Sequence, residues 1–251
     1  MLIEKYLSGS YSYLITFKED KTSYLNLASS LLNSKKGIGG DYLLVVNKET
    51  KEIEMYNDKE KEKNYIPSSL FVVHSFLKRH NLIEEPFYKI SYNNKTYPLH
   101  CLERRVVIPL GVASLIKELI SIDEIEIQGH KIKFSSLFLN EPLLVFYEDD
   151  IYSSFVFNHK EEILSHPLFK NKFCLCIISL TSEKVYIYNT KNIEFALGGG
   201  AYISYLIASI SLPFSLYYND ESYVISNEEN NIYLEGQSSF VCDCTFFEEY
   251  I

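Results

Sequence analysis

Three consecutive glycines, Gly198, Gly199 and Gly200, adjoin an apolar stretch with the pattern of a helix. Glycine has no Cβ, so a ligand can approach its backbone N–H groups, and the N-terminal end of a helix attracts anions. We therefore expect the glycines to form a loop that enters the helix. There they either hold a carboxylate or phosphate, or only relieve a tight turn.

Three side chains near the predicted helix starts have the chemistry of proton transfer: Asp58, His74 and Glu194. A carboxylate and a histidine together can move a proton to and from a substrate. The competing interpretation is structural, because loop carboxylates are usually solvated and His74 shares a helix face with Leu70 and Leu77.

The cysteines do not form a metal-binding pattern. They are Cys101, Cys174, Cys176, Cys242 and Cys244. The close pairs are separated by one residue, which places both side chains on one face of a strand. No Cys/His spacing matches a zinc site, so we expect reduced, buried thiols and no metal.

Composition narrows the class of protein. The 251 residues are 47% hydrophobic and carry a net charge of −9, which gives a nucleic-acid backbone no general attraction. The start of the chain lacks a cationic segment followed by an apolar core, so we expect a cytoplasmic protein. The uncharged stretch 195–219 contains three glycines and Pro213, and we interpret it as a buried helix rather than a membrane span.

The same order of elements occurs twice along the chain. We expect strands at 11–17, 42–46, 53–56, 143–147, 173–180, 184–188 and within 232–246, and helices at 22–33, from Pro67, at 161–165 and after the glycines. This order indicates an internal duplication of about 100 residues, with a junction near 109–111. The predicted domains are 1–110 together with a returning strand at 239–251, and 111–238.

Four segments resemble motifs of one enzyme family, in the same order. They are GIGGDYLLVV (37–46), MYNDKE (55–60), VYIYNTKNIEFALGGGA (185–201) and LEGQSSFV (234–241). Together they are similar to the motifs of diaminopimelate epimerases. The resemblance implies an α/β (α+β) fold of two pseudo-symmetric halves, each a mostly antiparallel curved sheet or barrel around a central helix. It also implies cofactor-independent chemistry in which one cysteine at the start of each central helix exchanges a proton with the substrate.

The resemblance fails at those cysteines. The family's two thiol positions fall on Ile66 and Leu197, whose alkyl side chains neither accept nor donate a proton. Epimerisation by two thiols is therefore predicted to be absent. The asparagine that precedes proline in the family falls on Glu141, whereas Asn57 is retained.

Several other residues near the helix starts are candidates for ligand binding. Ser68 and Ser69 carry hydroxyls next to Pro67, which lacks a backbone N–H, and Tyr11 and Tyr42 could line a cleft between the halves. The predicted ligand-binding set is Asn57, Ser68, Ser69, Tyr11, Tyr42, Gly198, Gly199 and Gly200. The alternative is that the tyrosines and serines only pack and satisfy helix-terminal donors.

Two functions and one structural role remain open on these observations, and the structural role is that of a scaffold whose cleft is closed by side chains. The first is a non-catalytic, epimerase-like protein, a pseudoenzyme, that binds a small carboxylate-bearing molecule or a protein partner in the cleft between the halves. The second is a cofactor-independent isomerase or epimerase of an amino-acid-like substrate that uses Glu194, Asp58 or His74 in place of the cysteines. Neither nucleic acid nor a membrane is expected as a partner, and a homodimer or heterodimer is left open.

Overall fold

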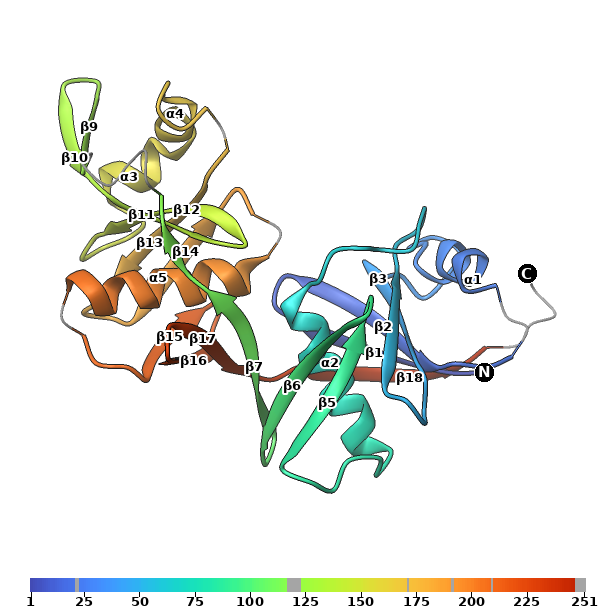
Figure 1. Ribbon diagram of the computed structural model, residues 1–251. Coiled ribbons are helices and arrows are strands. Elements are labelled where there is room, and N and C mark those ends of the chain that lie inside the picture. Colours follow the sequence, from blue (N-terminus) through green and yellow to red (C-terminus); the bar gives the residue numbers. More distant parts are fainter. Residues whose placement is uncertain (21–22, 117–122, 171, 191, 209, 247–251) are drawn as a thin grey trace. The chain divides into compact units, whose positions relative to one another are not determined.

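The fold was described from a computed structural model of the chain. The structure describes residues 1–20, 23–116, 123–170, 172–190, 192–208 and 210–246. The chain divides into two compact units, of which unit 1 contains residues 1–108 and 236–251, and unit 2 contains residues 109–235. Both units combine β-strands with a few helices, so the fold is a mixed α+β fold (Figure 1).

Unit 1 is a mostly antiparallel sheet. Its strands are β1 (Leu2–Ser8), β2 (Tyr11–Phe17), β3 (Tyr42–Val46), β4 (Glu52–Tyr56), β5 (Phe87–Tyr92), β6 (Lys95–Leu102), β7 (Arg105–Val112) and β18 (Ser239–Thr245), hydrogen-bonded in the order β18-β1-β2-β3-β4-β5-β6-β7. The pairs β2–β3 and β4–β5 are parallel. Because β18 comes from the end of the chain, the last strand completes the sheet that the first strand begins (Figure 1).

Two helices belong to unit 1, α1 (Tyr24–Leu31) and α2 (Pro67–Arg79). Helix α2 begins as the sequence predicted, with Pro67 at its first position, where a missing N–H leaves no intrahelical bond unmade. Its residues from Pro67 to His74 are all buried, whereas Lys78 and Arg79 in the last turn are exposed. The charged end therefore reaches solvent, while the start of the helix lies in the core.

Unit 2 repeats the arrangement around a second helix, α5 (Ile193–Ile207). Its strands are β8 (Ser114–Leu115), β11 (Ser135–Leu139), β12 (Glu141–Tyr147), β13 (Cys174–Ser179), β14 (Lys184–Tyr188), β15 (Phe214–Tyr218), β16 (Glu221–Glu228) and β17 (Asn231–Gly236), in the order β17-β16-β15-β14-β13-β12-β11-β8. Helix α5 packs against the strands from β11 to β16, so the sheet curves around it.

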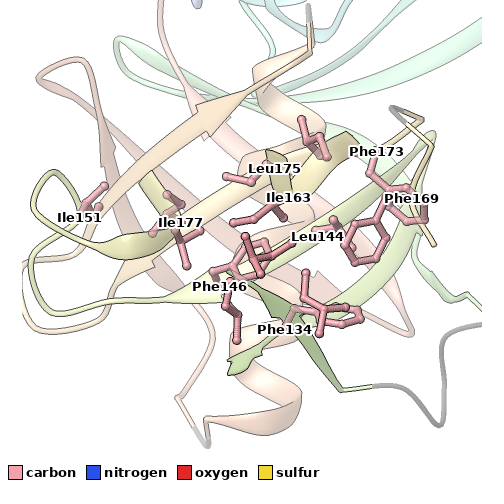
Figure 2. Close-up of a cluster of buried hydrophobic side chains, with 14 residues drawn as sticks. Phe134, Leu144, Phe146, Ile151, Ile163, Phe169, Phe173, Leu175 and Ile177 are labelled. Carbon is pink, nitrogen blue, oxygen red and sulfur yellow. The ribbon is translucent and has the colours of Figure 1, made fainter. Parts of the chain in front are cut away.

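The outer face of the unit 2 sheet is covered by a second set of elements. These are the hairpin β9 (Glu124–Ile127) and β10 (His130–Lys133) and the short helices α3 (Phe155–Asn158) and α4 (Lys160–Ser165). Figure 2 shows the core that results, in which Phe146 and Ile177 from the sheet meet Ile163 from α4 and Phe169. Alternate residues of β12 and β13 face α5 instead, and this explains why all six residues of β13 are buried.

Local structure follows the sequence pattern closely in several places. The predicted strands 11–17, 42–46 and 184–188 are confirmed with the same bounds as β2, β3 and β14. The predicted helix 22–33 is shorter, from Tyr24 to Leu31, and Thr22 lies outside the described residues. No helix in the described part of the chain is both long enough and apolar enough to cross a membrane.

Candidate functional site

The start of α2 is enclosed by the strands of unit 1. Ile66 is the residue before the helix, has an extended backbone and is only 5% exposed. The Ser69 hydroxyl donates to the Ile66 carbonyl at 2.7 Å, and the Ser68 hydroxyl shares a 2.7 Å hydrogen bond with the Tyr13 hydroxyl. Both serine hydroxyls, which we predicted to be ligand groups, are therefore engaged by neighbouring protein atoms.

Three tyrosines form an aromatic wall beside this helix start. Tyr13 on β2 pairs with Tyr42 on β3, and their ring centroids lie 5.8 Å apart, while the Tyr11 and Tyr42 centroids are separated by 5.2 Å. Tyr13 is fully buried, whereas Tyr11 and Tyr42 are half-buried. Burial raises the pKa of Tyr42, which keeps its hydroxyl protonated at neutral pH. The structure thus brings Tyr11 and Tyr42 together on neighbouring strands of unit 1.

The charged loop before α2 holds its own shape. The side-chain oxygen of Asn57 accepts hydrogen bonds from the backbone N–H groups of Lys59 and Glu60, both at 2.8 Å. The Tyr92 hydroxyl donates to the Glu62 carbonyl at 2.7 Å and fastens the loop to β5. Asp58 is exposed on this loop. The Asn57 oxygen therefore serves a turn, and Asp58 lies in a solvated position.

The glycines lie inside α5, and the prediction that they form a loop before this helix is wrong. The helix begins at Ile193, so Gly198 is its sixth residue, beyond the first turn whose N–H groups lack intrahelical acceptors. A Cβ at Gly198 would lie 2.4 Å from Leu110 Cδ1, and one at Gly199 would lie 2.8 Å from Leu143 Cδ2. The glycines are present because α5 packs too closely on its sheet for side chains.

Leu197 occupies the same buried turn of α5. It has no exposed surface and is the fifth residue of the helix, so it is not at the helix start, where a catalytic group would be expected from the resemblance. The five cysteines lie on β6, β13 and β18, and none is in α2 or α5. Burial raises the pKa of both Cys174 and Cys176, so these thiols stay protonated.

A carboxylate that we did not predict to be catalytic lies at the start of α5. Glu141, the first residue of β12, accepts a short hydrogen bond from the Thr190 hydroxyl. The oxygen of that hydroxyl accepts in turn from the backbone N–H of Asn192, the residue that precedes the helix, at 2.9 Å. Burial raises the pKa of Glu141, and the hydrogen bond from Thr190 partly opposes that rise. Glu141 is half-buried, so part of its surface reaches solvent.

Glu194 lies in the first turn of α5 and has no exposed surface. A carboxylate at this position interacts favourably with the helix dipole. Its charge contributes to the raised pKa of Tyr223 on β16, after burial and the hydrogen bond from Tyr223 to Glu221. Sequence reasoning identified Glu194 as a candidate but missed Glu141. The available signal was that Glu141 stands directly before Pro142, where the family has a substrate-binding asparagine.

His74 has surroundings different from those of Asp58. It lies in α2, 1% exposed, with Nδ1 2.9 Å from the Tyr88 hydroxyl and 3.6 Å from Cys101 Sγ. Burial, with a smaller contribution from Lys78, lowers the pKa of His74 to about 4, so the ring is neutral at pH 7. The described residues contain no group of three or more His, Cys, Asp or Glu side chains able to hold a metal ion.

Comparisons with known proteins bear on the fold. No protein-family model matches the sequence, and no curated protein matches it. A protein from Clostridium difficile described as a phenazine-biosynthesis PhzC/PhzF protein has a TM-score of 0.68 and 8% identity, with 98% of this chain and 99% of that chain covered. A PhzF-family phenazine biosynthesis protein from Bacillus anthracis has a TM-score of 0.63 and 9% identity, covering 97% and 98%.

An isomerase has the same architecture. Methylitaconate-delta-isomerase matches with a TM-score of 0.57 and 7% identity, covering 97% of this chain and 95% of that chain. The chain therefore has the diaminopimelate epimerase-like fold that these proteins share over their full lengths. At these identities the likeness concerns the fold alone, so the resemblance to diaminopimelate epimerases holds for the architecture and not for a particular enzyme.

Proposed function

We propose that this chain is a cofactor-independent isomerase that moves a proton between two carbons of a small carboxylate-bearing molecule. The observation that carries the proposal is the Glu141 carboxyl, half-buried at the start of α5, with a raised pKa and a hydrogen bond from Thr190. A general base works best when its pKa lies close to the working pH, and burial moves Glu141 in that direction. The fold, which is shared with an isomerase, is compatible with this chemistry.

Because Glu141 is a single acid–base group, the proposal favours an allylic proton shift over the inversion of a stereocentre. In the proposed step Glu141 takes a proton from a carbon next to an unsaturated carboxylate, so that the C–H bond breaks, an O–H bond forms and the electron pair delocalises into the substrate. The carboxylic acid then returns the proton to another carbon on the same face. Inversion would need a second group on the opposite face, and the family's two thiol positions carry Ile66 and Leu197.

Glu194 has a positioning role in this proposal. Glu194 has no exposed surface, so we assign it no direct part in the proton transfer, and a carboxylate in the first turn stabilises the N-terminal end of α5. Asp58 and His74 take no part in proton transfer, because Asp58 is solvated on a loop and His74 is held by Tyr88.

Hydrogen exchange in deuterated water tests the proposal. The purified chain is incubated with a panel of β,γ-unsaturated carboxylates and amino acids, and deuterium incorporation is followed by proton NMR. We expect deuterium to be incorporated at carbon in at least one unsaturated carboxylate. The rate of incorporation is expected to fall by about 100-fold or more in Glu141→Gln. The matched control is Glu148→Gln, because Glu148 is also a unit 2 carboxyl whose pKa is raised by burial. An unchanged rate in Glu141→Gln would refute the assignment.

The alternative is a protein that binds such a molecule without converting it. It is favoured by one observation, that hydrocarbon side chains with 5% and 0% exposure occupy the family's thiol positions, at Ile66 and Leu197. Saturable binding of a panel member with no deuterium incorporation in the wild-type chain would support this alternative and contradict the isomerase.

A further inference from the structure

A hollow of about 580 Å³ lies in unit 1 beside the last two turns of α2. Its walls come from α2, from the turn between β6 and β7, and from the segment that leads into β18. Sites for small organic molecules commonly have volumes of ~300–1,000 Å³, so the hollow is large enough for more than a bare inorganic ion.

Two cations in its wall have no carboxylate partner. Lys78 on α2 and Arg104 in the β6–β7 turn are both exposed, and neither forms an ion pair within the described ranges of the chain. Arg79 is different, since it contacts Glu4 and Asp243 and lies 4.0 Å from the centroid of the Phe240 ring. Glu103 also lines the hollow, but it forms no ion pair with Lys78 or Arg104 among the described residues. In a chain with a net charge of −9, two cations without an ion-pair partner in one hollow form a local site for an anion.

His74 supplies a buried polar atom in the same wall. Its Nε2 has no hydrogen-bond partner among the described residues, although its exposed fraction is 1%. Nδ1 lies beside the Tyr88 hydroxyl, which burial keeps protonated and able to donate to that nitrogen. In that arrangement Nε2 carries the ring proton and is a donor without an acceptor, and a buried donor left unsatisfied destabilises the fold.

From these features we infer that the hollow binds the phosphate group of a small phosphorylated molecule, through Lys78, Arg104 and the Nε2–H of His74. A phosphate monoester carries up to two negative charges, which match the two unneutralised cations, and its three terminal oxygens match the three donors. Ser75 and Ser238, whose hydroxyl oxygens are 2.8 Å apart in the wall, provide polar contacts for the rest of the molecule. This site is separate from Glu141 and does not depend on the proposed isomerase.

Phenyl phosphate and benzoate test the inference, because they share a ring and differ in the anion. Isothermal titration calorimetry on the full chain is expected to show saturable, one-to-one binding of phenyl phosphate and at least tenfold weaker binding of benzoate. The double variant Lys78→Gln/Arg104→Gln is expected to lose at least tenfold in affinity, because both hydrogen bonds to the phosphate from charged groups are removed. In parallel, the 15N chemical shift of His74 Nε2 should move as phenyl phosphate is added.

The matched control is Lys95→Gln/Lys133→Gln, which removes two charges from exposed lysines that do not line the hollow. It is expected to keep wild-type affinity. The inference is overturned if phenyl phosphate does not saturate the wild-type chain, if both double variants weaken binding equally, or if the Lys78/Arg104 variant binds normally. Benzoate binding as tight as that of phenyl phosphate would overturn the choice of phosphate.

Discussion

The Thr190 hydroxyl donates a hydrogen bond to the Glu141 carboxylate and accepts one from the backbone N–H of Asn192. A single hydroxyl thus connects the first residue of β12 with the residue before α5. The bond from Thr190 stabilises the charged form of Glu141, while burial opposes it.

Removing this hydroxyl is expected to raise the pKa of Glu141. Thr190→Val keeps the shape of the side chain but takes away the donor, so burial acts on Glu141 without compensation. Thr190→Ser keeps the donor and is expected to leave the pKa close to the wild-type value. The pKa is measured from the 13C shift of the Glu141 carboxyl during a pH titration, and an equal or lower pKa in Thr190→Val would contradict this account.

The sequence indicated where α2 starts but not where α5 starts, and the two cases differ physically. Pro67 fits only a few positions in a helix, and the first is the most favourable. Three glycines in a row have poor helix propensity, so they indicated a loop. In the structure the glycines are helical, because only glycine allows α5 to approach Leu110, Leu143 and Cys176 this closely. Contacts between residues so distant in sequence were not visible in the local pattern.

The pKa of His74, about 4, predicts a pH dependence of stability. The folded-state pKa is below the unfolded value of ~6.5, so the unfolded chain binds more protons between these pH values. The contribution of His74 is therefore fully present above about pH 6.5 and is lost as the pH falls towards 4. We expect the titration of His74 to lower the free energy of unfolding by about 2 kcal/mol as the pH falls from 6.5 to 5, as measured by urea denaturation.

Two variants separate the cause of this pH dependence. His74→Gln removes the titrating group and is expected to flatten that part of the profile. Tyr88→Phe removes the hydroxyl beside Nδ1 but leaves the ring buried, and since burial is the main cause of the shift, its profile should keep the slope. A profile that is as steep in His74→Gln as in wild type would show that other groups are responsible.

Glu4 is expected to be important for the stability of unit 1. It is 1% exposed and accepts a hydrogen bond from the Tyr6 hydroxyl at 2.6 Å, with His80 Nε2 at 2.8 Å and Arg79 Nε at 3.5 Å. Removing one member of a buried charged group leaves its partners uncompensated, so Glu4→Gln is expected to cost about 3 kcal/mol in the free energy of unfolding. The exposed Glu84→Gln serves as control, and a loss below about 0.5 kcal/mol in Glu4→Gln would contradict the prediction.

Much of the fold, but less of the candidate site, followed from the sequence. Strands such as β3 and β14 are short runs of aliphatic and aromatic residues between polar turns, and β-branched and aromatic residues bounded by turn residues are typical of strands. The hairpin β9–β10 was not predicted, because each of its strands has only four residues, although buried Ile125 and Ile127 alternate with charged residues in β9. The position of Glu141 before Pro142 was visible in the sequence, but its burial and its hydrogen bond with Thr190, which is 49 residues away in the chain, were not.

The glycines of α5 give the sharpest test of the packing argument. A Cβ at Gly199 would lie 2.8 Å from Leu143 Cδ2 and 3.2 Å from Leu137 Cδ1, and both leucines are 1% exposed. Overpacking of this kind costs about 1–3 kcal/mol, whereas replacing glycine by alanine within a helix gains about 1 kcal/mol. We therefore expect Gly199→Ala to destabilise the wild-type chain by about 1 kcal/mol in urea denaturation.

The sign of this effect is expected to change once the neighbour is removed. In a Leu143→Ala background the added methyl group enters the space that the leucine leaves, so Gly199→Ala should be neutral or stabilising there. This sign change cannot come from helix propensity, which is the same in both backgrounds. If Gly199→Ala were equally destabilising with and without Leu143, close packing against β12 would not be the reason that glycine occupies this turn of α5.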